Sequence, residues 1–149
     1  GPSGDILHQQ IIQGYRPIRG FQLATVAVHS ERLIGGVANA DLQDKIQVSI
    51  DFMLPFATSL HGPSSELRVL APRGWEFPAS CALEGVRLGP YTSIGNCRAV
   101  DRELILAVAG SINPGVENQV FGFVAAVQPP PSTAVDDIWV LQAFALVGS

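Results

Sequence analysis

Three histidines are the residues of this chain that could act as general bases near neutral pH: His8, His29 and His61. A histidine beside a nucleophile and an acidic orienting group would support hydrolysis. His8 precedes the predicted strands, His29 closes one of them, and His61 lies in a Ser-Leu-His-Gly-Pro loop. The chain has no Gly-x-Ser-x-Gly turn to present a serine nucleophile. The sequence therefore favours solvated or hydrogen-bonded histidines, and we expect no enzymatic activity.

Paired carboxylates could serve glycoside hydrolysis, and they occur at Asp101/Glu103 and Asp136/Asp137. Residues two apart on a strand share one face and lie about 7 Å from each other. Such charges more often face solvent and protect a sheet edge from pairing with another chain. We favour this simpler role for both pairs.

Calcium is the metal that the acidic residues could suit best, because it prefers hard oxygen ligands. Asp41 and Asp44, in the turn that begins at Asn39, are weak candidates, since their spacing lacks the register of an EF-hand loop. The Gly35-Gly36 pair leads into no predicted helix and so forms no phosphate-binding loop. The sequence predicts no cofactor.

The two cysteines, Cys81 and Cys97, can form one disulfide. It would close a loop of about 15 residues and contribute on the order of 3 kcal/mol in the chain-entropy model. The alternative is a pair of reduced, buried thiols. A zinc site is disfavoured, because two cysteines without nearby histidines do not complete a tetrahedral ligand set.

Exposed aromatic rings could stack on a sugar, and Trp139, Tyr91 and Phe144 are the candidates for such a glycan-binding strip. Trp139 follows Asp136-Asp137 at a predicted strand start, where its indole could be either exposed or buried. Trp75, after the Pro72-Arg73-Gly74 turn, is more readily explained as a core residue, because aromatic rings bury a large apolar area.

The elements that would position these residues are strands, because the apolar residues repeat with period two. From Ile46 to Leu54, hydrophobic side chains alternate with polar ones until Pro55. Similar segments end at proline or glycine, where a missing N–H or a turn costs little. The further predicted strands are 21–29, 66–71, 103–109, 120–127 and 138–147.

Together these segments predict an all-β chain folded as a two-sheet antiparallel β-sandwich, with roughly seven to nine strands. We assign residues 21–149 to the sandwich domain and residues 1–20 to an N-terminal extension or an added edge strand. The length of 149 residues suits one domain with a full core.

The composition restricts the partners. Hydrophobic residues make up 47% of the chain and charged residues only 15%, with a net charge of −4. Without a Lys/Arg cluster, binding to nucleic acid is disfavoured. No apolar run approaches the roughly 18 residues of a membrane-spanning helix, so membrane insertion is not expected.

The order of motifs resembles a known class of module. The segment from Ser65 to Phe77 has the pattern strand–Ala-Pro–x–Gly–aromatic–x–Phe, and Cys81 follows it. After Cys81 come a second cysteine, Pro114-Gly115, Phe121-Gly122-Phe123 and Asp137-Ile138-Trp139. This order is similar to repeat modules of very large secreted or surface proteins of dinoflagellates and related protists, over roughly residues 36 to 147. The resemblance implies an immunoglobulin-like module that is repeated in tandem, structural and extracellular.

These observations predict a non-catalytic structural or interaction module of a larger extracellular or cell-surface assembly, packing with like modules. The alternative is a carbohydrate-binding or adhesion module that uses the aromatic residues above.

Overall fold

The computed structural model describes residues 15–17, 22–29, 31–33, 39–54, 59–62, 65–90, 92–131 and 138–146. Regular structure in these residues consists of strands and one 3-10 turn, η1 (Ala40–Leu42). No helix in this part of the chain is both long enough and apolar enough to cross a membrane. The predicted all-β class is therefore confirmed.

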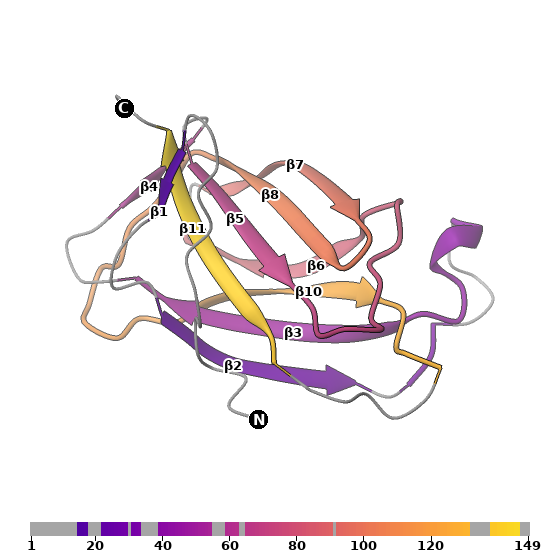
Figure 1. The fold of residues 1–149 in the computed structure, drawn as a ribbon. Helices are drawn as coiled ribbons and strands as arrows, with labels where there is room; N and C mark the ends of the chain where they lie inside the picture. The colour runs from indigo at the N-terminus through magenta and orange to yellow at the C-terminus, as the bar shows by residue number, and fades with distance from the viewer. Residues whose placement is uncertain are drawn as a thin grey trace.

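The strands form two large antiparallel sheets and a small ribbon (Figure 1). Sheet A has the order β1-β11-β5-β8-β7, sheet B has the order β2-β3-β10-β6, and β4 pairs with β9. In chain order the strands are β1 (Tyr15–Pro17), β2 (Gln22–His29), β3 (Ile46–Met53), β4 (Leu60–His61), β5 (Ser65–Leu70), β6 (Leu83–Arg87), β7 (Ser93–Val100), β8 (Glu103–Ala109), β9 (Ser111–Ile112), β10 (Phe121–Val127) and β11 (Val140–Leu146).

The two large sheets lie as two layers over a shared core (Figure 1). Along β3 the burial alternates residue by residue, as the period-two pattern predicts. Phe52 of β3 and Phe121 of β10 meet in this core with ring centroids 5.9 Å apart. Sheet A contributes Leu67, Val69, Leu104, Leu106, Val108, Leu141 and Ala143 to the same core. The arrangement is that of a sandwich of antiparallel sheets.

The segment between the two cysteines, in which the sequence predicts no strand, is not a loop in the structure. The intervening chain forms β6 and β7, which are edge strands of sheet B and sheet A respectively. The pairing of each strand with its neighbour is irregular. The register between β6 and β10 shifts between Gly122 and Val124 of β10, and the register between β7 and β8 shifts between Ile94 and Asn96 of β7. A bulge inserts a residue and so breaks the strict alternation by which strands are recognised in a sequence.

Late strands lie between early ones in both sheets: β10 between β3 and β6, and β11 between β1 and β5. An immunoglobulin sandwich places its last two strands side by side in one sheet. Here β10 and β11 belong to different sheets. The described strands thus show an antiparallel, sandwich-like fold, and the immunoglobulin-like subclass stays a prediction.

The N-terminal stretch contributes β1, which pairs with β11 along its three residues. β1 is therefore at one edge of sheet A. The rest of residues 1–20 lies outside the described residues, so the domain boundary at residue 20 stays a prediction.

Candidate functional site

The two described histidines contact serine hydroxyls. His29 Nε2 lies 2.7 Å from Ser49 Oγ on the outer face of sheet B, the face turned away from the core. His61 Nδ1 lies 2.9 Å from Ser111 Oγ, where β4 pairs with β9. His8 lies outside the described residues. The two imidazoles contact different serines, Ser49 in sheet B and Ser111 in the β4–β9 ribbon.

A hollow of about 540 Å³ opens beside His29 on the outer face of sheet B. Its lining includes two carboxylates, but Glu84 accepts a hydrogen bond from Gln47 Nε2 rather than from the imidazole. The lining residues are Val28, His29, Glu31, Gln47, Glu84 and Val124. The histidine thus lines an open hollow, and its contact with Ser49 is part of a surface hydrogen-bond network.

The predicted carboxylate pair at Asp101 and Glu103 is not a pair on one strand face. Asp101 lies in the two-residue turn between β7 and β8, in the left-handed region with φ +55°. Glu103 begins β8, and its carboxylate lies 3.8 Å from Arg68. The turn therefore separates the two groups that strand geometry would have aligned. Asp136 and Asp137 lie outside the described residues.

The calcium candidates have structural contacts. Asp41 Oδ2 accepts a hydrogen bond from the Ser80 backbone N–H at 2.9 Å, which ties η1 to the loop before Cys81. Asp44 adopts φ +63°, and its carbonyl accepts a bond from Arg32. Among the residues that the structure describes, no three His, Cys, Asp or Glu side chains gather as a metal site. Asp41 is thus a loop anchor in this structure.

Two of the three proposed glycan-stacking residues are buried, which corrects the idea of an exposed strip. Trp139 is 3% exposed and Phe144 0%. Trp139 belongs to the core, and its ring meets Trp75 edge-on with centroids 5.2 Å apart. Phe144, five residues further along β11, points to the other face of sheet A, where Arg68 stacks over it. Tyr91 lies outside the described residues.

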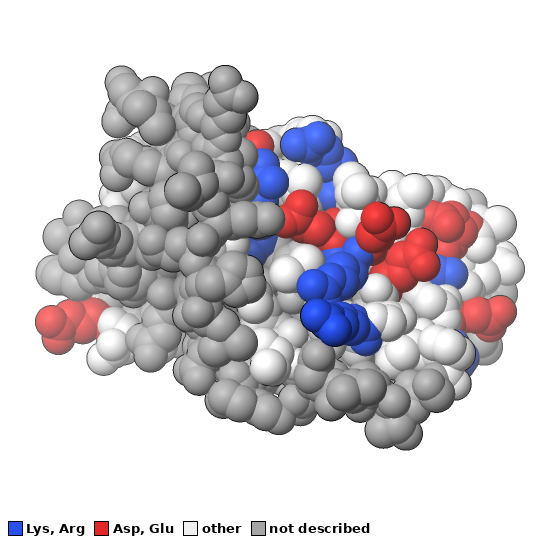
Figure 2. Space-filling model, viewed as in Figure 1, with Lys and Arg blue, Asp and Glu red and all other residues white. Residues whose placement is uncertain are grey.

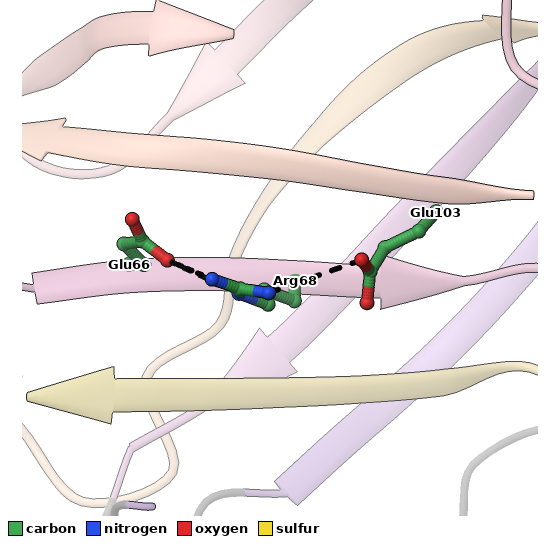
Figure 3. Close-up of polar contacts among 3 residues, drawn as sticks. All are labelled: Glu66, Arg68 and Glu103. Atoms are coloured by element: carbon green, nitrogen blue, oxygen red, sulfur yellow. Dashed lines mark hydrogen bonds and ion pairs between the residues drawn. The ribbon is translucent and has the colours of Figure 1, made fainter. Parts of the chain in front are cut away.

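Arg68 is at the centre of a partly buried charge cluster on the outer face of sheet A (Figure 3). Its guanidinium donates to Glu66 Oε2 at 2.8 Å and approaches Glu103, and it lies 5.6 Å from the centroid of the Phe144 ring. Both faces of β11 are buried here, since Val140 and Gln142 are also largely inaccessible. The guanidinium is thus paired with carboxylates and stacked on a ring, which is the arrangement expected of a half-buried cation.

The visible face of the molecule mixes basic and acidic side chains rather than gathering one sign (Figure 2). Sheet B has a similar balance on its outer face, where Asp51 accepts from Thr25 Oγ1 at 3.0 Å and pairs with Arg87. Gly122 lies between them, and a side chain there would strike the Asp51 and Arg87 head groups and the Ile50 carbonyl. Glycine at this position therefore leaves room for the Asp51–Arg87 ion pair.

Cys81 and Cys97 lie at disulfide distance, with Cα atoms 5.9 Å apart. The pair connects the loop before β6 to the edge strand β7, and so joins the segments that lead into the two sheets. The spacing is well within the range that a disulfide needs.

We predict that the cysteine pair is oxidised and stabilises the fold. Replacing both Cys81 and Cys97 by alanine should lower the free energy of unfolding by about 3 kcal/mol, measured by urea denaturation, because the reduced chain regains loop entropy. A reductant should shift the wild-type midpoint and leave that of the double variant unchanged. Two reactive thiols in the unfolded, unreduced protein would contradict the prediction.

The edge strands differ in how they are protected against pairing with another chain. β1 has three residues, including Arg16 and Pro17; β6 carries Glu84 and Arg87; β7 carries Arg98 and a bulge. Charges, proline, bulges and short length are the usual devices that protect an edge. β2 is the exception, because its eight residues contain no Lys, Arg, Asp, Glu or Pro.

The regular part of β2 is also accessible. Its register shift lies between Leu23 and Thr25, so the segment 25–29 pairs evenly with β3. Thr25, Ala27, Val28 and His29 are exposed, and Val28 retains 44% of its accessible surface. We define these five residues, Thr25 to His29, as the open edge. An uncharged, exposed and regular edge is a template for an added strand.

Comparisons with models of known protein families, with curated proteins and with solved structures found no match.

Proposed function

We propose that this chain is a non-catalytic interaction module that assembles with like modules by strand addition. The observation that carries the proposal is the open edge of β2, whose five residues contain no charged side chain, no proline and no register shift. Main-chain hydrogen bonds to an added strand would supply affinity there, and the alternate side chains would supply selectivity.

The rest of the molecule supports a scaffold role. One core shared by two sheets makes a rigid unit, and the charged side chains near β11 and β3 are engaged with each other. The carbohydrate-binding alternative loses its two described ring candidates to burial. The histidine contacts are those of surface hydrogen-bond networks.

The place of action that we propose is extracellular or at the cell surface. A cysteine pair at disulfide distance suits an oxidising compartment. The immunoglobulin-like subclass and the tandem arrangement belong to the same proposal and derive from the motif resemblance alone.

Sedimentation velocity tests the proposal. The chain should associate as its concentration is raised from the low micromolar range, and a longer chain with its natural neighbours should associate more strongly, because linked modules bind with a higher effective concentration. A protein that stays monomeric in both forms at all concentrations would overturn it.

A further inference from the structure

The hydrogen-bond directions in sheet B determine which backbone groups β2 offers to a partner. Ala126 of β10 donates its N–H to the Ala82 carbonyl, on the side away from β3. Backbone groups alternate in direction along a strand, so Ala125, the next residue, must bond to Val48 of β3. The backbone N–H and C=O groups of Gln47 and Ser49, the neighbours of Val48, therefore point the other way, toward β2.

The partners of Gln47 and Ser49 on β2 are His29 and Ala27. The backbone groups of these two β2 residues are therefore used within the sheet. The N–H and C=O groups of Val26 and Val28 point outward at the open edge. Two donors and two acceptors are thus available to an added strand.

We infer that the open edge binds the open edge of a second copy of this chain, antiparallel, about a twofold axis at Ala27. In this register each Val26 exchanges two hydrogen bonds with the partner copy's Val28, giving four bonds across the axis. The inference rests on the proposed function and specifies its partner and geometry.

The side chains of the open edge complement themselves in this register. Val26 faces the partner's Val28 on the core side, and the 44% of Val28 that is now accessible would be covered. On the outer face Thr25 lies opposite the partner's His29, and Ala27 lies opposite its own copy. β-Branched and polar cross-strand pairs of this kind stabilise a sheet.

Alternative registers fit less well. A twofold axis at Val26 or at Val28 would still let outward-pointing backbone N–H and C=O groups meet. It would, however, place Ala27 opposite the partner's Thr25 or His29. It would also pair one of the two valines with a residue outside the regular segment. An axis at Ala27 uses all five residues of the open edge. Ala27 and its copy would form a pair that is not directly hydrogen-bonded, and the Cα atoms of such a pair lie only about 4.5 Å apart. A small side chain such as alanine suits this short distance.

Charge exchange at Ala27 tests the inference. Ala27→Lys and Ala27→Glu each place like charges opposite one another at the axis, and each should weaken self-association by about tenfold or more. Mixing the two variants should restore association, because opposite charges then meet. Asn96→Lys, on the exposed outer side of β7, is the matched control and should associate like the wild type.

Cysteine cross-linking tests the register independently. Ala27→Cys should form a covalent dimer on mild oxidation, because its Cα atoms lie within disulfide range across the axis. Thr25→Cys should cross-link with His29→Cys and not with itself. Cross-linking of Ala27→Cys with Thr25→Cys or with His29→Cys, and not with itself, would overturn the twofold register.

The outcomes separate this inference from the proposed function. If the wild type associates and the Ala27 charge variants associate equally well, assembly uses another surface and the inference fails alone. If the wild type does not associate at any concentration, both fail. Circular dichroism and urea denaturation should show that the variants keep wild-type stability, since Ala27 is exposed.

Discussion

Replacing Trp139 by alanine should lower the free energy of unfolding by about 3–5 kcal/mol, the usual cost of truncating a buried aromatic ring. Trp139 is 3% exposed, precedes β11 and packs edge-on against Trp75. The variant would lose the burial of the indole and leave a cavity between the layers, because close-packed neighbours relax only in part.

Urea denaturation followed by circular dichroism would measure this loss. Trp75 remains as the sole tryptophan of the variant and reports its own surroundings by fluorescence. Val116→Ala is the surface control, because that side chain is 63% exposed, and it should change stability little. A Trp139→Ala variant that is as stable as the wild type but fails to bind glycan would restore the stacking role.

Gly62→Ala should destabilise the fold by about 3 kcal/mol or more, at the upper end of overpacking effects. A Cβ atom at Gly62 would lie 1.8 Å from the Val108 carbonyl oxygen and 2.6 Å from its carbon. Both are backbone atoms of β8, so no side-chain rotation can relieve the contact. The Gly62 N–H also donates to the Gly110 carbonyl at 2.7 Å, which holds the chain close.

Gly115→Ala is the matched control. Its Cβ would meet only the end of the Gln119 side chain, at 3.5 Å, and the substitution should be nearly neutral. Thermal unfolding of the two variants beside the wild type gives the comparison. Equal midpoints for Gly62→Ala and Gly115→Ala would show that the β4 end of the sandwich separates from β8 at little cost.

The sequence predicts the strands in which burial strictly alternates or both faces are apolar. β3 shows the clearest alternation, and β10 and β8 are rich in Phe, Val, Leu and Ile. β7 escapes this reasoning because its bulge changes the spacing of the residues that pack on the core: Ile94, Cys97 and Ala99 are three and then two positions apart. A period-two search finds no face in such a segment.

The candidate functional residues were harder to predict than the fold. Alternation along a strand assigns a residue to one of two faces, but it does not tell which face is covered. Trp139, just before β11, and Phe144, within it, face opposite sides of sheet A, and both are buried. A sequence displays reactive side chains directly, whereas the open edge consists of backbone groups with small apolar neighbours. Its one sequence signal was the absence of charge in 22–29.

The distribution of protection among the edges is the strongest reason to regard β2 as an interface. A chain that left all its edges open would be prone to aggregate, and one that blocked all of them could not associate by strand addition. Here β6 and β7 carry charged residues and register shifts, and β1 is short. β2 combines eight residues with an uncharged sequence and a regular five-residue segment. Among the described edges of the two large sheets, one is open, and a single open edge permits pairing once about a twofold axis. The expected product is therefore a closed dimer with a sheet continuous across both copies.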